Sequence, residues 1–534
     1  MREIDRRRFL QSACALAVAG AVPAWAQSGA RRPPYARGGV FAQSVASGQP
    51  SMSGATLWTR LEGIDRTVRL QVEISPDEDF RRLIYRQDVV ADAARDFTVH
   101  HRADHRVLQP GEQYFYRFVT CDEDSPIGRF RTARPADSRE PVRIGCFSCQ
   151  RYPRGYFTPH AALLNEDVDL IVSLGDYIYE TGERVRYPDR ADRTGADGNG
   201  EVQTLAEYRD KYTLYHSDPH LQALRARHPM AAIWDDHEFE NNYAGDGPSP
   251  NPEERTVSRR RVSFQERQGS AYAAFFEHLP VLRTADFPRI YGSIPLGGNA
   301  EVFLLDTRQY RDEQPCGDVT IQPCDPADRE NPARTLLGPA QKAWLKDGLQ
   351  RSTAAWKVVA NQVMIMSLDV PPRSPVNPDQ WDGYAAERRE LLEHVSARGV
   401  KDVSFVTGDI HTFFAGNVTP SGREGAPPVD GVPVATEFVG GSVTSEGIGD
   451  EFRLNEAGVA GELSTEAGVR ANNPHIKAAD LIHRGYGVLE ASQQELKVRF
   501  RAVRSVAQPR SEVFTTKEFR VARGSASVEN VGAL

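Results

Sequence analysis

The sequence lacks the long lysine- and arginine-rich runs that bind nucleic acid. It holds 65 basic and 73 acidic side chains, with a formal net charge of −8, so its overall field would repel polyanions. Beyond the N-terminus it also lacks an apolar stretch long enough to span a membrane. There is no internal repeat and no long low-complexity tract. These absences leave a loop-rich globular chain without a nucleic-acid partner or membrane span.

The N-terminus contains three export features in order. Arg6-Arg7-Arg8-Phe9-Leu10 precedes an alanine-rich apolar stretch over 12–21, and Ala24-Trp25-Ala26 follows it. The apolar stretch is too short for a membrane span, and small residues at an A-x-A site are typical of signal cleavage. The arginine pair is typical of a twin-arginine (Tat) signal. We expect the Tat export machinery to carry the chain to the periplasm or outside, with residues 1–26 removed.

Cysteine is scarce, with six residues in 534, and Cys14 would leave with the signal. Five remain, so at least one thiol stays unpaired in an oxidising compartment. Cys316 and Cys324 bracket a short loop containing Pro, Asp and Gly, which predicts a disulfide between them. Cys121 and Cys146 cannot be assigned from the sequence.

The mature chain divides into two regions with different sequence patterns. Residues 38–135 show short alternating strands separated by turn signals, which predicts a small all-β sandwich of the immunoglobulin or fibronectin type. Residues 141–523 predict an α/β domain of layered sheets and helices. Apolar strands there end abruptly in polar clusters, with predicted strands at 142–147, 168–174, 231–234, 302–305, 357–360 and 403–407. Polar residues at strand ends are how layered α/β enzymes build their sites.

Four of these strand ends carry groups that suit metal ions. Asp176 and Tyr179 follow one strand, Asp236 and His237 follow a second, Asn361 ends a third, and Asp409 and His411 follow a fourth. Taken singly, each is as readily a turn residue, a packed ring or a core histidine. Placed together at successive strand ends, they predict a metal centre.

The first strand ends in Cys146-Phe147-Ser148-Cys149-Gln150. A lone Cys149 would more often be a buried thiol than a ligand. Residues three apart on a strand face opposite ways, so only one of Cys146 and Cys149 points toward the predicted site. We expect Cys149, with Cys146 as its competitor.

The order of these motifs resembles the calcineurin-like metallophosphoesterases, and a tyrosine three residues after the aspartate resembles purple acid phosphatases. Several positions depart from that pattern: Cys149, Asp236, Asn361 and Asp409 stand where those enzymes usually have Asp, Asn, His and His. These departures are similar to the PhoD-like alkaline phosphatase family. Further stretches support the resemblance, among them 45–50, 305–311, 379–384 and 437–441.

The resemblance implies an iron ion beside calcium. Cys149, Asp176, Tyr179 and His411 suit Fe³⁺, whereas Asp176, Asp236, Asn361 and Asp409 offer only oxygen, which favours Ca²⁺ over zinc. We expect metal-activated hydroxide or oxide to attack phosphorus in line. His237 would protonate the leaving group or hold the phosphate. Arg308 would clamp a phosphate oxygen, although pairing with Asp306 or another acid is an equal alternative.

The expected function is an alkaline phosphatase that acts as a monomer on small phosphate esters, on diesters as well as monoesters. A phosphodiesterase or phospholipase D is the alternative within the same chemistry. A calcium-stabilised binding module is the rival class, but it would not need a thiolate, a phenolate and an imidazole at one ion. Whether a C-terminal segment around 517–523 covers the site stays open, as does whether Trp381 and Tyr384 line its mouth.

Overall fold

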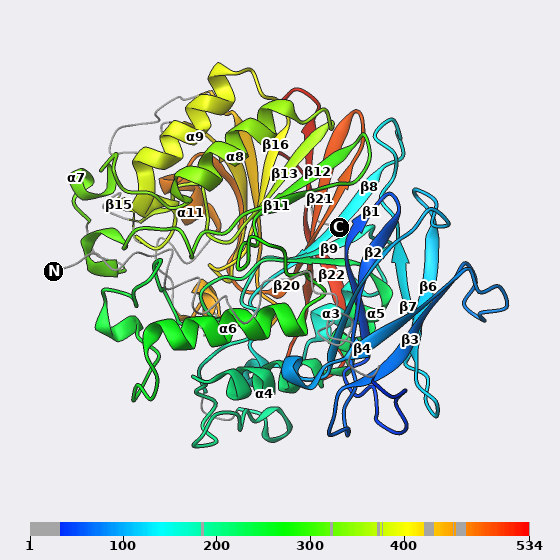
Figure 1. Cartoon of the computed structure of the whole chain (residues 1–534). Helices are drawn as coiled ribbons and strands as arrows, with labels where there is room; N and C mark the ends of the chain where they lie inside the picture. Colours follow the sequence, from blue (N-terminus) through cyan, green and yellow to red (C-terminus); the bar gives the residue numbers. More distant parts are fainter. Residues whose placement is uncertain are drawn as a thin grey trace.

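The computed structural model describes residues 33–182, 186–320, 324–370, 374–375, 377–420, 432–451, 453–454 and 466–532. The predicted signal over 1–26 lies outside the described residues. None of the described helices is long and apolar enough to cross a membrane. The described chain is built around two large sheets that face each other, with helices on their outer faces (Figure 1).

In the described part of the chain, ten strands form the first sheet. Their order is β23 (Glu529–Gly532), β22 (Val513–Ala522), β21 (Glu495–Val503), β20 (Arg484–Ala491), β8 (Val142–Phe147), β9 (Leu170–Ser173), β10 (Met230–Ala232), β1 (Val45–Ser51), β2 (Gly54–Arg60) and β5 (Thr98–Asp104). The central strands β8, β9 and β10 are parallel.

The second sheet contains seven strands among the described residues. Their order is β11 (Gly292–Pro295), β12 (Ala300–Leu304), β13 (Trp356–Asn361), β16 (Val403–Thr407), β18 (Ala435–Gly440), β17 (Phe413–Val418) and β19 (Ile476–Asp480). The run β12, β13, β16, β18 is parallel. Both sheets therefore have a parallel centre, so the carboxyl ends of several strands lie together at one edge.

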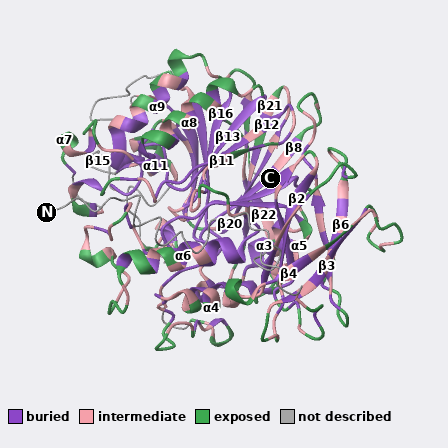
Figure 2. Cartoon of the chain, viewed as in Figure 1, coloured by how far each residue is buried: buried purple, intermediate pink, exposed green. Residues whose placement is uncertain are grey.

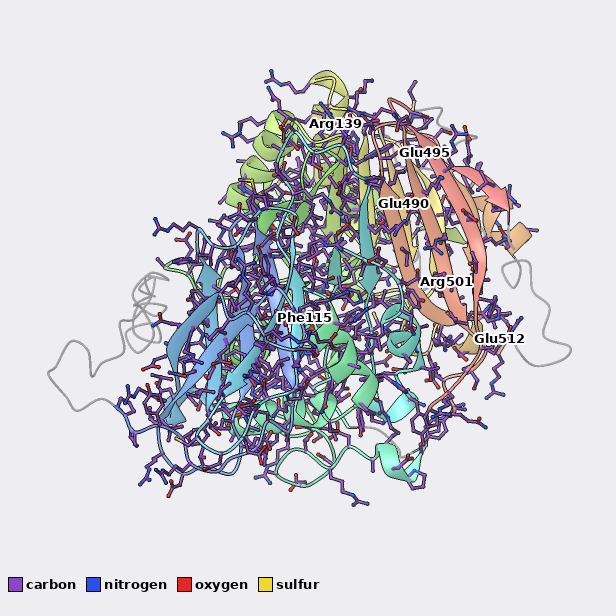
Figure 3. The ribbon with its side chains drawn as sticks, turned by 90° about the vertical axis from the view of Figure 1, so that its right-hand side faces the viewer. Phe115, Arg139, Glu490, Glu495, Arg501 and Glu512 are labelled. Atoms are coloured by element: carbon purple, nitrogen blue, oxygen red, sulfur yellow. A yellow bond between two sulfur atoms is a disulfide. The ribbon has the colours of Figure 1, made fainter. Side chains whose placement is uncertain are left out.

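The core lies between the two sheets, where the strands are buried (Figure 2). Phe500 of β21 contacts Phe413 of β17, with ring centroids 5.0 Å apart. Along β21 the side chains alternate, so Leu496, Val498 and Phe500 point inward. Glu495 and Arg501 lie on the opposite, partly exposed face (Figure 3). This period of two is the pattern expected of a sheet with one solvated face.

Helices cover the outer faces. Helices α8 (Gly338–Arg351) and α9 (Ala385–Ala397) lie against the second sheet, where Leu345 and Leu391 join the cluster around Phe405. Helices α3 (Thr158–Leu163) and α5 (Pro219–Arg227) contact strands of the first sheet, and α4 (Leu205–His216) packs on α6 (Phe264–His278).

The N-terminal β region has a sheet of its own and also extends the first sheet. Its four described strands are β4 (Tyr85–Ala91), β3 (Val68–Ser75), β6 (Gln113–Val119) and β7 (Gly128–Arg131). They share a hydrophobic cluster with β1, β2 and β5. Strand β1 in turn pairs with β10 at Gly48 and Met230. The predicted sandwich thus consists of this four-stranded sheet and of β1, β2 and β5, which continue the first sheet. The boundaries 38–135 and 141–523 stay predictions.

The C-terminal segment that the sequence left open is part of the first sheet. Residues 513–522 form β22, which pairs with β21 along its length. Phe519 of this strand contacts Phe438 of the second sheet, with centroids 5.8 Å apart. Residues 517–522 therefore belong to a strand of the first sheet, and Phe519 packs against the second sheet.

The predicted disulfide between Cys316 and Cys324 is confirmed, with Cα atoms 5.6 Å apart. Among the described residues Cys121, Cys146 and Cys149 are free thiols, and Cys121 alone of these is exposed. Next to Cys316, Asp318 accepts hydrogen bonds from Asn242 Nδ2 (3.0 Å) and Ser249 Oγ (2.7 Å). The disulfide thus closes a loop that is tied to the chain following β10.

We expect the double substitution Cys316→Ser/Cys324→Ser to lower the free energy of unfolding by about 2–3 kcal/mol, because a short closed loop no longer restricts the unfolded chain. Urea denaturation of the oxidised proteins measures this. Cys121→Ser is the control and should leave the midpoint unchanged. An unchanged midpoint in the double variant would contradict the prediction.

Candidate metal centre

The predicted ligands lie at the shared carboxyl edge of the two sheets. Cys149 follows β8, Asp176 follows β9, and Asp409 and His411 follow β16. All four have positive φ, at 60°, 53°, 61° and 54° respectively. Left-handed backbone is unfavourable for residues other than glycine, by about 1–2 kcal/mol each, and such strain gathers at functional sites. The chain therefore turns sharply at each strand end and brings these side chains together.

Cys149, Asp176 and His411 form one cluster, in which one ligand atom from each lies within 4.8 Å of the others. Tyr179 completes it: its hydroxyl donates to Asp176 Oδ2 at 2.9 Å and lies 3.2 Å from His411 Nε2. Ser445 Oγ lies 2.6 Å from the same hydroxyl. Four donors from three different strand ends thus converge on one small volume.

The structure separates the two competing thiols. Cys146 lies on β8 within the hydrophobic core, and burial raises its pKa to about 12. Cys149 lies one residue beyond Ser148, in the cluster with Asp176 and His411. The geometry therefore favours Cys149 as the candidate ligand.

A bound cation would suit this cluster, because burial makes its thiol and its phenol hard to ionise. Burial, followed by the nearby Asp176 carboxylate, raises the pKa of Cys149 and of Tyr179 well above their usual values. A metal ion reverses this effect, because its charge stabilises thiolate and phenolate. Asp176 Oδ1 is buried with no hydrogen-bond partner among the described residues. A buried unsatisfied oxygen between donors of this kind fits a metal ligand.

A second cluster consists of Asp235, Asp236 and Asp409, again with ligand oxygens within 4.8 Å. Asp176 and Asp236 also group with His237, so Asp176 lies between the two clusters. Asp235 was not predicted as a ligand, although it directly precedes Asp236. Burial raises its pKa well above the usual value, despite the opposing charge of Arg308. Burial likewise raises the pKa of Asp409 to about 6.

Arg308 is fully buried among these acids. Its guanidinium pairs with Asp379 at 2.8 Å, Asp409 at 3.1 Å and Asp236 at 3.5 Å, and its Nε donates to Asp235. Asp306, the partner considered from the sequence, instead accepts from the Arg308 backbone N–H at 3.1 Å. The single arginine thus links four carboxylates at the edge of the site.

His237 lies between the two clusters and a buried carboxylate. Its Nδ1 is 2.7 Å from Glu180 Oε2, and its ring lies 4.2 Å from the ring of Tyr179. Burial lowers the pKa of His237, but the charges of Glu180 and Asp236 outweigh burial and raise it to about 10. The imidazole is therefore oriented by Glu180, with its Nε2 left for other contacts.

Asn361 ends β13 in a fully buried position. Its Oδ1 accepts a hydrogen bond from Trp381 Nε1 at 3.3 Å, and its Nδ2 donates to the carbonyl of Val363. Next to Trp381, Gln380 donates to Asp409 Oδ2 at 2.5 Å. Trp381 is thus a buried partner of Asn361, and Tyr384 is buried with its hydroxyl on the Asp312 carbonyl (2.7 Å).

Glu238 holds the backbone next to the site in place, a role that the sequence did not predict. Its carboxylate accepts the backbone N–H groups of Asp176 (3.0 Å), Tyr177 (2.7 Å) and Asp235 (2.8 Å). It thereby joins the turns after β9 and β10. The only signal in the sequence was its place in the acidic run that follows β10, which does not distinguish a ligand from a support.

Models of known families match most of the chain. The PhoD-like phosphatase model matches residues 144–500, and the model for the N-terminal domain of PhoD-like phosphatases matches residues 25–134. The chain belongs to the PhoD-like phosphatase family. It is accordingly a phosphoric ester hydrolase, as its motifs predicted.

Individual relatives agree with this assignment. Alkaline phosphatase D of Bacillus subtilis (strain 168) is 32% identical over 552 residues, covering 99% of this chain and 89% of that protein. A solved structure of PhoD superposes with a TM-score of 0.80 at 29% identity, covering 94% of each chain. A purple acid phosphatase from yellow lupin gives a TM-score of 0.51 at 11% identity, covering 88% of this chain and 73% of that one. This last likeness is one of fold alone.

We expect Cys149→Ser to lower the amount of metal bound per chain, because serine replaces a soft anionic donor in the cluster. Cys146→Ser is the matched control, since it changes the same atom in the hydrophobic core and should keep the full metal content. Elemental analysis of the purified proteins measures both. Equal metal content in the two variants would rule out Cys149 as a ligand.

Proposed function

We propose that the protein is an exported alkaline phosphatase that releases phosphate from monoesters and also accepts diesters. The observation that carries the proposal is the convergence of Cys149, Asp176, Tyr179 and His411 on one volume at the sheet edge. Proteins that only bind calcium use oxygen ligands and have no need of a thiol and an imidazole there.

Fe³⁺ fits this first cluster. A thiolate, a phenolate and a carboxylate would offset its charge, and His411 would supply a neutral nitrogen. Ca²⁺ fits the second cluster, which takes oxygen from Asp236, Asp409 and the shared Asp176, with Asn361 adding an amide oxygen. Asp235 is a further carboxylate beside these ligands. When bound, the ions neutralise phosphate oxygens and make water a stronger nucleophile.

His237 would then act on the ester itself, with Arg308 holding the acids around it. Arg308 is also a candidate clamp for a phosphate oxygen from the sequence, but its donors are bonded to Asp235, Asp379 and Asp409. We therefore assign it to position these carboxylates. His237 is oriented by Glu180 through Nδ1, which leaves Nε2 to donate a proton to the departing alcohol oxygen. Positioning and charge neutralisation are most of what phosphoryl transfer requires.

For His237→Ala we expect turnover of an alkyl phosphate to fall by about 10²–10⁴-fold, the usual contribution of a general acid. Turnover of p-nitrophenyl phosphate should fall less, because nitrophenolate departs without a proton. The measurement is the ratio of kcat values for the two esters in each protein, with metal content determined alongside. An equal loss for both esters at full metal content would contradict the acid role.

The proposed activity is tested by comparing p-nitrophenyl phosphate with bis-p-nitrophenyl phosphate. We expect turnover of both, with the monoester faster, and a visible tyrosinate–iron band that Tyr179→Phe removes. Turnover of the diester alone would favour the phosphodiesterase or phospholipase D alternative. A colourless, inactive protein that binds only calcium would overturn the proposal.

A further inference from the structure

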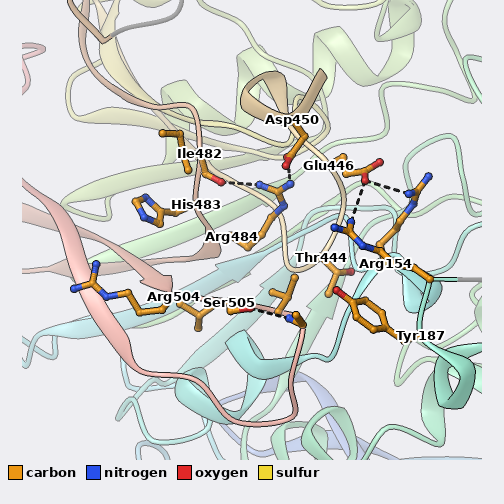
Figure 4. A pocket seen from close by; sticks show the side chains of 14 residues that line it. Arg154, Tyr187, Thr444, Glu446, Asp450, Ile482, His483, Arg484, Arg504 and Ser505 are labelled. Carbon is orange, nitrogen blue, oxygen red and sulfur yellow. Dashed lines mark hydrogen bonds and ion pairs between the residues drawn. The ribbon is translucent and has the colours of Figure 1, made fainter. Parts of the chain in front are cut away.

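A pocket of about 320 Å³ lies beside the metal centre. It is formed where the segments after Cys149, after Tyr179 and after Thr444 meet the ends of β20 and β21 (Figure 4). Its charged lining contains more basic than acidic groups: Arg154, Arg186, Arg484 and Arg504 against Glu446 and Asp450. In a chain with net charge −8, such a local excess attracts anions.

Two carboxylates hold three of the guanidinium groups in place. Glu446 Oε1 pairs with Arg154 at 3.1 Å and with Arg186 at 3.3 Å, and Asp450 pairs with Arg484 (Figure 4). Arg504 pairs with Glu512 at 3.7 Å and lies over the ring of Phe514, 4.0 Å from its centroid. The Glu446 carboxylate is thus shared by two arginines.

The donors of this cluster are not exhausted by these pairs. The Arg484 side chain is 10% exposed, and its Nε is buried without a hydrogen-bond partner among the described residues. The Arg186 side chain is 54% exposed. Guanidinium groups present several N–H donors in one plane, which suits the oxygens of a phosphate. Ile482, Val503 and Val506 add apolar lining, suited to the carbon chain that carries such a group.

The pocket wall is continuous with the metal centre. Glu446 binds the arginines through its carboxylate, and its backbone carbonyl accepts from His411 Nδ1 at 2.7 Å. Ser445 contacts the Tyr179 hydroxyl. The His411 side chain is 22% exposed, against 2% for Asp176. The metal centre is therefore open to solvent at His411, and the backbone of Glu446 links His411 to the pocket wall.

We propose that this pocket binds a second phosphate, one that is not cleaved, of a substrate whose scissile phosphate lies at the metal centre. The preferred substrates are then organic phosphates with two phosphate groups joined by a short carbon chain. The proposal rests on the proposed function, since it takes the metal centre as the place of cleavage.

Phosphonates test the pocket without turnover, because their carbon–phosphorus bond is not hydrolysed. Titration calorimetry on the metal-loaded, full-length protein compares butylphosphonate with α,ω-alkane bisphosphonates of four to eight carbons. We expect the bisphosphonate of one of these lengths to bind at least about 10-fold more tightly than the monophosphonate. Charge-assisted hydrogen bonds to one added phosphonate group provide a gain in affinity of about this size. Equal affinity at every length would overturn the proposal.

Variants then assign the gain to the pocket. Arg186→Gln and Arg484→Gln should each reduce the bisphosphonate advantage by about 10-fold, the effect of losing one charge-assisted contact. Arg186 is half-exposed, so its variant should fold even if the buried Arg484 proves necessary for stability. Arg520→Gln is the control, because Arg520 is 49% exposed and pairs with Glu495 away from the pocket. An advantage that survives both pocket variants would refute the assignment.

Failure of this inference differs from failure of the proposed function. A protein that hydrolyses phosphate esters but shows no bisphosphonate preference would refute the pocket alone. A protein that hydrolyses none of them but retains the preference, sensitive to Arg186→Gln, would support the pocket as an anion site and refute the proposed function.

Discussion

Mutual repulsion among buried carboxylates is the constraint on which this site depends. Asp176, Asp235, Asp236, Asp379 and Asp409 lie together at the edge of two sheets, and four of them pair with the one guanidinium of Arg308. Buried charges of one sign are costly unless they are paired or bind metal. Burial raises the pKa values of Asp235 and Asp409 even though Arg308 pairs with both. Cations would supply the missing positive charge.

The architecture explains how so many acids come to one place. Parallel strands in the centre of each sheet end at the same edge, and the two sheets face each other across a shared core. Loops from both sheets therefore meet above that core. The left-handed turns at Cys149, Asp176, Asp409 and His411 direct side chains inward immediately after each strand. Glu238 and Ser445 join these turns to one another.

The charge pattern also differs between the metal centre and the neighbouring pocket. The metal centre is lined by acids and would repel a phosphate until cations are bound, whereas the pocket beside Glu446 is lined by arginines. The segment Thr444–Glu446 separates the two and contacts both. A substrate with two phosphates could thus meet metal-held charge at one end and guanidinium charge at the other.

The sequence by itself determined the family, the all-β region followed by an α/β domain, the strand ends that carry the candidate ligands and the Cys316–Cys324 pair. These depend on local order: alternation, apolar runs ending in polar clusters, and short spacing. Only the tertiary structure distinguished Cys146, which lies on β8 in the hydrophobic core, from Cys149, which lies beyond that strand beside Asp176 and His411, because these neighbours are far apart in the chain. It also revealed Asp235, Glu180 and Glu238 as parts of the site. It showed that the N-terminal β region continues the first sheet and that Arg308 is buried among acids. Each of these depends on contacts between residues far apart in the chain, which no local pattern records.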